Sequence, residues 1–383
     1  MSIYDFDYNI LDVVNCLQLP VRKVDGSAIY VDCPFCTVNP VNGHTGKGKM
    51  QIKIAKDQYH CCRCDSGGGM LDLICKTQNV SVKVAHKIMC EYTGNELYDK
   101  NTTSTVYANA KANAENQANK APDEVIDFTY HEFLNMCSLS AEHKKHLQVI
   151  RGLSSQNIKQ MGFKSVPTSR NQHSRIISRL LLYNHQLEGV PGFFIDKKGN
   201  WNYNAFDYAK GIFIPMIDIN NRIIGIQIRL DKPFDDGRKY IWFASPNKNK
   251  GTTSGSPYHI TTTDIKNDTV YITEGGLKAN IASRYSFCPF IAVAGVNNTK
   301  CLPPLLKELK KRGVKRIVDC FDSDCEYNEQ VEKARGKLMS MVLHHQLDYC
   351  RMEWDSQYKG IDDYLFAVPR QQWKFHCTEI KHK

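Results

Sequence analysis

Residues 269–295, TVYITEGGLKANIASRYSFCPFIAVAG, contain the clearest fold pattern in the C-terminal part of this chain. The stretch begins with an apolar run of β-branched and aromatic residues that ends at Glu274, and such a run indicates a buried strand. Two glycines, a helix-like segment and a second apolar run follow. Strand, helix and strand in this order predict a parallel sheet with helices on its faces.

The same alternation continues towards the C-terminus, with apolar runs at 315–322 and 348–354. Functional residues of such sheets gather at the carboxyl ends of the strands. Glu274 and Asp322-Ser-Asp324 both stand at such ends, and Asp362 follows the last strand. Carboxylates placed together repel one another unless divalent cations neutralise them, which favours a magnesium site. The alternative, acids that cap the helices of an ordinary α/β domain, stays open.

Upstream, residues 213–242 alternate in a way that predicts strands, with a hairpin turn at Asn220-Asn221. Before them, residues 101–124 are rich in Asn, Ala, Thr and Lys and contain almost no large apolar side chains, which is typical of a linker.

Composition is that of a globular protein, with 42% hydrophobic and 23% charged residues and a formal net charge of +10. A basic balance without a basic amphipathic helix fits a polyanion partner better than a membrane. The acidic start, MSIYDFDYNILDVV, does not resemble a signal peptide, and no apolar run of about 18 residues occurs. We therefore expect a cytoplasmic protein with no membrane partner, in which clustered cysteines bind metal.

Two C-x-x-C pairs, Cys33–Cys36 and Cys61–Cys64, predict a structural zinc ribbon. Each pair can direct two thiolates at one ion, and two pairs complete a tetrahedral site. His44, His60 and Cys62 fit less well as ligands, because Cys62 lies inside the second pair and should point away from the metal.

Between the two pairs, basic and polar residues alternate with Met50, Ile52 and Ile54. A strand here would present one basic and one apolar face. Together with Tyr59 and Arg63, the basic face could follow a single-stranded nucleic acid and stack its bases. A solvated lysine face is an equally good interpretation. The basic residues concerned are Lys49, Lys53 and Arg63.

Several segments resemble DnaG-type DNA primases. The segment 59–74, YHCCRCDSGGGMLDLI, is similar to the second cysteine pair and the following helix of their zinc domains. Residues 272–282 (ITEGGLKANIA), 321–324 (FDSD) and 359–365 (KGIDDYL) resemble the three acidic motifs of a Toprim domain. The segments 150–163, 211–230 and 238–260 resemble the N-terminal part of the primase RNA-polymerase core and its basic, nucleotide-facing stretch, particularly as found in primase-like proteins of phages and mobile elements.

The resemblance implies a multidomain α+β and α/β protein. The expected parts are a zinc-ribbon DNA-binding domain (1–100), a linker (101–124), the N-terminal part of the polymerase core (125–262), a Toprim domain (263–367) and a tail (368–383). Glu274, Asp322, Asp324 and Asp362 match the catalytic carboxylates that hold Mg²⁺ or Mn²⁺, and Arg229, Lys239 and Lys250 match basic positions that hold template or nucleotide phosphate.

Three positions depart from the family pattern. Cys36 replaces a histidine that often serves as a zinc ligand, Lys278 replaces an acid four residues after Glu274, and Gly360 replaces a further acid before Asp362. The lysine either removes one metal site or meets phosphate itself.

The resemblance implies template-directed synthesis of a short RNA primer on single-stranded DNA from ribonucleoside triphosphates. It also implies a separate replicative helicase as partner, since the chain has no G-x-x-x-x-G-K-[ST] motif, and a bacterial, phage or mobile-element setting. Two alternatives remain, a Toprim nuclease and a non-catalytic recombination mediator resembling RecR. Primer synthesis, DNA cleavage or neither would distinguish the three.

Overall fold

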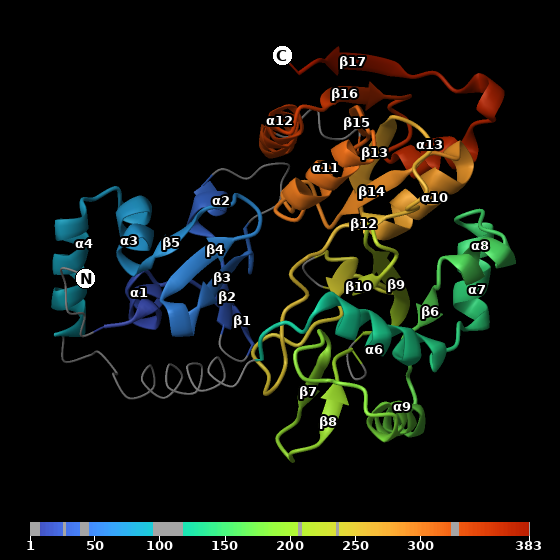
Figure 1. The fold of residues 1–383 in the computed structure, drawn as a ribbon. Coiled ribbons are helices and arrows are strands. Elements are labelled where there is room, and N and C mark those ends of the chain that lie inside the picture. Colours follow the sequence, from blue (N-terminus) through green and yellow to red (C-terminus); the bar gives the residue numbers. More distant parts are fainter. Residues whose placement is uncertain are drawn as a thin grey trace. The chain divides into compact units, whose positions relative to one another are not determined.

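In the computed structural model the chain forms two compact units (Figure 1). The structure describes residues 8–25, 28–38, 46–94, 118–205, 209–234, 237–322 and 329–382, with the backbone alone at 329–331. Unit 1 comprises residues 1–119 with the short segments 195–200 and 246–252, and unit 2 comprises the remainder. The expected linker falls largely outside the described residues, but its last two positions already belong to a helix, α6.

Unit 1 is built on an antiparallel five-stranded sheet in the order β1-β2-β3-β4-β5. Its helices pack their apolar sides into one core with Met50, Ile52 and Tyr59. The elements are α1 (Ile10–Cys16), β1 (Val21–Asp25), β2 (Ala28–Val31), α2 (Pro34–Val38), β3 (Met50–Lys53), η1 (Ile54–Lys56), β4 (Gln58–Cys61), β5 (Gly67–Gly69), α3 (Met70–Gln78) and α4 (Val82–Thr93).

The N-terminal half of unit 2 contains a four-stranded sheet in the order β11-β10-β9-β6. The predicted hairpin is present, because β9 and β10 pair antiparallel, Asp218 accepts the backbone N–H groups of Asn220 and Arg222 at 2.8 Å, and Asn221 takes a positive φ. The elements are α6 (Asp123–Asn135), α7 (Ala141–Val149), α8 (Ser155–Gln160), β6 (Lys164–Ser165), α9 (Arg170–Leu182), β7 (Phe193–Ile195), β8 (Trp201–Tyr203), β9 (Gly211–Ile217), β10 (Ile223–Leu230) and β11 (Tyr240–Trp242).

The C-terminal half of unit 2 is a six-stranded sheet in the order β12-β14-β13-β15-β16-β17. The predicted parallel arrangement is confirmed for the four central strands, while β12 and β17 add antiparallel edges. The elements are β12 (His259–Ile260), β13 (Thr269–Glu274), α10 (Gly276–Ser286), β14 (Phe290–Val293), α11 (Leu302–Lys311), β15 (Arg316–Asp319), α12 (Glu329–His344), β16 (Asp348–Glu353), α13 (Ile361–Ala367), η3 (Arg370–Gln372) and β17 (His376–Ile380).

Apolar contacts join the two halves of unit 2 into one body. Leu277 and Ile281 of α10 share a core cluster with Ile212 and Ile214 of β9 and with side chains of α7 and α8. A β carbon on Gly276 would lie 3.0 Å from the Met216 sulfur, so glycine allows the first turn of α10 to approach β9 closely. The carboxyl end of β13 is thereby brought close to β9.

None of the helices in the described part of the chain combines the length and apolar character needed to cross a bilayer.

Candidate active site and zinc site

The four predicted zinc ligands come together in unit 1. The sulfur atoms of Cys33 and Cys64 lie 3.7 Å apart, those of Cys36 and Cys61 lie 3.8 Å apart, and all four lie within 4.8 Å of one another. A tetrahedron with zinc–sulfur bonds of about 2.3 Å has sulfur–sulfur edges of about 3.8 Å. The four-cysteine cluster therefore fits a structural zinc ion.

Local structure directs these thiols inward. The Cys36 N–H donates to the Cys33 carbonyl at 3.2 Å, and the Asp65 N–H donates to the Cys61 carbonyl at 2.9 Å, so each pair is held on a tight turn. A β carbon on Gly46 would stand 2.5 Å from that of Cys36, which explains the glycine at this position. Burial and the adjacent Cys61 raise the pKa of Cys36, and a bound zinc ion would favour the thiolate form.

The remaining ligand candidates do not join the cluster. Cys62 is exposed and its thiol points to the Lys49 carbonyl, as its place inside the second pair predicts. His60 contacts Asp65 at 2.9 Å, and His44 lies outside the described residues.

The predicted two-faced strand is also present. In β3, Met50 and Ile52 are buried whereas Lys53 is exposed. Lys49 and Arg63 are partly exposed on the same sheet region. The stacking role of Tyr59 is wrong, because the ring is buried in the core and its hydroxyl donates to Asp72 at 2.7 Å. Its position on β4, opposite the apolar Ile52, places the ring in the core.

In unit 2, three of the four predicted carboxylates lie at one edge of the parallel sheet. Glu274 ends β13, Asp322 follows β15 and Asp362 lies in the first turn of α13. Asp324 lies outside the described residues. The parallel order of β13 and β15 is what places the first two carboxylates side by side.

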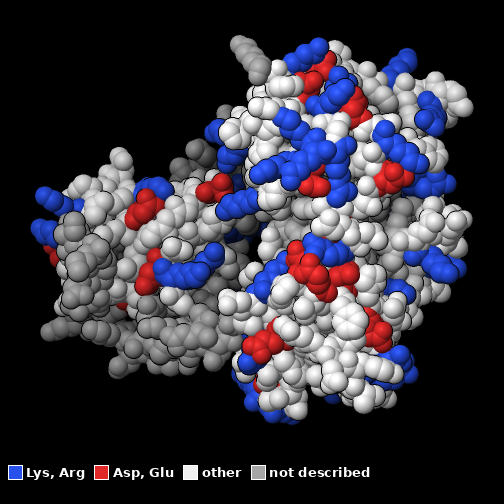
Figure 2. Space-filling model, viewed as in Figure 1, with Lys and Arg blue, Asp and Glu red and all other residues white. Residues whose placement is uncertain are grey.

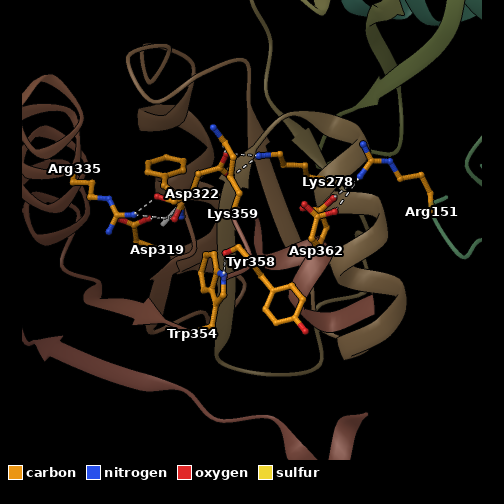
Figure 3. Close-up of polar contacts among 11 residues, drawn as sticks. Arg151, Lys278, Asp319, Asp322, Arg335, Trp354, Tyr358, Lys359 and Asp362 are labelled. Carbon is orange, nitrogen blue, oxygen red and sulfur yellow. Dashed lines mark hydrogen bonds and ion pairs between the residues drawn. The ribbon is translucent and has the colours of Figure 1, made fainter. Parts of the chain in front are cut away.

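Lys278 lies among these acids, in the first turn of α10. Its ammonium donates to both oxygens of Asp322, at 2.6 Å in the case of Oδ2 (Figure 3). Burial lowers the pKa of Lys278, but Asp322, with Asp362 and Glu274, outweighs burial and leaves this pKa above its ordinary value. Lys278 is therefore a fixed positive charge at the centre of the acidic edge.

Asp362 is almost fully buried, and its two oxygens differ. Oδ2 accepts from Arg151 at 3.4 Å, whereas Oδ1 is buried without a hydrogen-bond partner. Burial, together with the neighbouring Asp363, raises the pKa of Asp362 to about 6. An unpartnered buried carboxylate oxygen is costly unless a ligand meets it.

Arg151 was not among the residues predicted to form the site, although it lies in the segment 150–163 that resembles the polymerase core. It follows α7 and pairs with Asp362 (Figure 3). It also pairs with Asp363. Arg229 of β10 and Arg151 also act electrostatically on Tyr240 of β11, as do Lys278 and Asp362. The pKa of Tyr240 is raised chiefly by burial. The contact between Arg151 and Asp362 joins residues that are far apart in the chain, so no local sequence pattern could predict it.

A second group that the sequence did not reveal holds the segment before Asp322. Asp319 is fully buried and receives the Tyr349 hydroxyl at 2.6 Å and the Phe321 N–H at 2.9 Å. Arg335 of α12 pairs with Asp319 and donates to the carbonyls of Phe321 and Asp322 (Figure 3). This network fixes the backbone that presents Asp322.

The two other predicted basic residues lie in separate segments. Lys239 is exposed just before β11. Lys250 belongs to the segment 246–252, which groups with unit 1.

The described residues fit only part of a magnesium site. Asp362 offers an open oxygen, but Lys278 engages both oxygens of Asp322. Across the described ranges, the one group of three or more metal-ligating side chains is the four-cysteine cluster.

Figure 2 shows Lys and Arg gathered over part of unit 2, including the outer side of α11. This helix turns Leu302, Leu305, Leu306 and Leu309 inward. Its outer face and the following turn expose Lys307, Lys310, Lys311, Arg312 and Lys315. Part of the net positive charge of the chain is thus concentrated on the outer face of α11.

Comparison with known proteins agrees with this architecture. Residues 261–372 match a family model described as "Domain of unknown function (DUF3854)". The chain is 23% identical over 319 residues to a protein named DNA primase from Clostridium acetobutylicum, an alignment that covers 82% of this chain and 48% of that protein. The chain thus spans about half the length of this curated relative.

The fold is similar to the crystal structure of the Aquifex aeolicus primase, zinc-binding and RNA polymerase domains. The TM-score is 0.51 at 16% identity, and the match covers 94% of this chain and 80% of that one. At this identity the match establishes the fold alone, an N-terminal zinc-binding part followed by a mixed α+β part with a parallel sheet.

Proposed function

We propose, from the premise that this chain is of the DnaG primase type in sequence and fold, that it synthesises short RNA primers on single-stranded DNA. The 3′-hydroxyl oxygen of one ribonucleotide attacks the α-phosphorus of the next, a new phosphodiester bond forms, and the bond to pyrophosphate breaks. The hydroxyl proton passes to a base, for which Glu274 at the end of β13 is the candidate.

The observation that supports this proposal is that basic and acidic side chains lie together where the sheet of β9 and β10 approaches the parallel sheet. Arg151, Arg229 and Lys278 are electrostatic neighbours of Tyr240 there, and Asp362 is another. Fixed cations are suited to orient the phosphates of a bound nucleotide, because guanidinium and ammonium groups form charge-assisted hydrogen bonds to phosphate oxygens.

Mg²⁺ or Mn²⁺, held by Asp362 with Glu274 and Asp324, would supply further neutralisation of the triphosphate. Asp322 contributes by holding Lys278 in place. The zinc ribbon, with Lys49, Lys53 and Arg63, would hold the template strand, because basic side chains track the nucleic-acid backbone. A separate helicase and a phage or mobile-element setting belong to the same proposal.

The test is incubation of the full chain with single-stranded DNA, ribonucleoside triphosphates and Mg²⁺ or Mn²⁺. New RNA is expected, and Asp322→Ala should reduce its yield by about 100-fold or more, since the variant frees Lys278 from its partner. Asp264→Ala, which removes an exposed acid elsewhere in unit 2, serves as control.

Cleaved DNA without RNA would favour the nuclease alternative, and binding without either reaction would favour the recombination mediator. Full primer yield from Asp322→Ala would refute the site assignment.

A further inference from the structure

We propose that the Lys278 ammonium is the resident counter-cation of the carboxylate pair Asp322 and Asp362, standing where a divalent ion would otherwise be needed. The acidic edge of this chain then binds one divalent ion fewer than it would with an acid at position 278. The inference deepens the proposed function and rests on it only for the use of the site in nucleotidyl transfer.

The first support is the saturation of Asp322. Its side chain is 8% exposed, and Lys278 donates to both of its oxygens. Lys359 adds a second, exposed ammonium at 3.9 Å from Oδ2. Lys278 thus competes with a metal ion for both oxygens of Asp322, and its positive charge repels a cation that approaches them.

The second support is the unpartnered oxygen of Asp362, Oδ1, which lies beside Gly360, near Lys278 and Asp322. A β carbon built on Gly360 would lie 2.5 Å from Asp362 Oδ1, 3.5 Å from the Lys278 nitrogen and 3.6 Å from Asp322 Oδ1. Glycine at 360 therefore leaves open a small space that these three groups surround. An unpartnered, buried carboxylate oxygen facing this space marks it as a cation site.

Charge decides which cation occupies the space. Asp322 and Asp362 carry two negative charges, Lys278 offsets one of them, and Arg151 pairs with Oδ2 of Asp362. A divalent ion entering beside the lysine would meet a positive charge at a separation of a few ångströms in a partly buried setting, where repulsion is strong. Removal of that ammonium should open the site, and an acid in its place should complete it.

The experiment measures Mn²⁺ binding to the zinc-loaded full chain by electron paramagnetic resonance, without DNA or nucleotides. Lys278→Met should bind Mn²⁺ at least about tenfold more tightly than the parent chain, because the competing charge is gone. Lys278→Asp should bind one additional Mn²⁺ per chain. Lys278→Arg should behave like the parent, and Lys266→Met, which removes a lysine that pairs with the exposed Asp264, should leave Mn²⁺ binding unchanged.

Unchanged Mn²⁺ number and affinity in both Lys278→Met and Lys278→Asp would overturn the inference. Tryptophan fluorescence melting checks that each variant is folded, and Lys278→Met alone decides if Lys278→Asp unfolds. Because no primer is made in this measurement, tighter Mn²⁺ binding would support the inference even if the parent chain proved inactive. Primer synthesis with unchanged Mn²⁺ binding would uphold the proposed function and refute the inference.

Discussion

Arg335→Met tests the buried network that supports the acidic edge. The Arg335 side chain is 6% exposed and its partner Asp319 is fully buried, so the substitution leaves a carboxylate buried without its cation. Methionine keeps much of the apolar length of the side chain. The substitution therefore removes the charge and the two hydrogen bonds to the carbonyls of Phe321 and Asp322.

Removal of one partner of a buried ion pair costs about 3–5 kcal/mol. Asp319 retains the hydrogen bonds from Tyr349 and Phe321, which favours the lower end, about 3 kcal/mol. For a unit of this size each kcal/mol lowers Tm by about 2–4 °C, so the expected shift is about 6–12 °C. Primer synthesis should fall as well, because the backbone of Asp322 loses its support.

All four tryptophans, at 201, 242, 354 and 373, lie in unit 2, so tryptophan fluorescence reports its unfolding. Urea and thermal unfolding of Arg335→Met should be compared with Arg351→Met. Arg351 forms ion pairs with the partly exposed Glu332 and Glu353, and its loss should cost about 0–1 kcal/mol. Equal effects of the two substitutions would refute the argument from burial.

Two further predictions concern zinc and pH. Elemental analysis should find one zinc ion per chain in the parent protein and none in Cys36→Ser, while the fluorescence melting of unit 2 stays unchanged. Cys62→Ser should retain its zinc, because Cys62 lies outside the cluster. Zinc loss from both variants would contradict the ligand assignment. Burial of His259 lowers its pKa from 6.5 to about 4, so the unfolded chain takes up a proton first, and the free energy of unfolding of unit 2 should fall by up to about 3 kcal/mol between pH 6.5 and pH 4. His259→Asn keeps an acceptor for the Ile217 N–H and should lack this part of the pH dependence of stability. An equal pH dependence in both proteins would count against the role of His259.

Some of the site could be predicted because its residues follow local rules. The two cysteine pairs place four sulfur atoms together through two tight turns. Glu274 could be predicted at the end of a strand because an apolar run precedes it. Tyr59 shows where such rules fail, because an aromatic residue beside basic ones reads equally well as a stacking platform or as a core side chain. Only the packing of α3 against β4, with Asp72 beneath the hydroxyl, decides the question.

The zinc ligands, the hairpin of β9 and β10 and the parallel sheet could be predicted from the sequence, since each depends on periodicity and spacing within a short segment. It also singled out Lys278, but not what Lys278 contacts. The folded structure was needed to show that Lys278 donates to Asp322, and that Arg151 contacts Asp362, which lies more than two hundred residues away in the chain. The physical reason is that charges act through space, and the packing of α10 on β9 sets which charges lie within a few ångströms of each other.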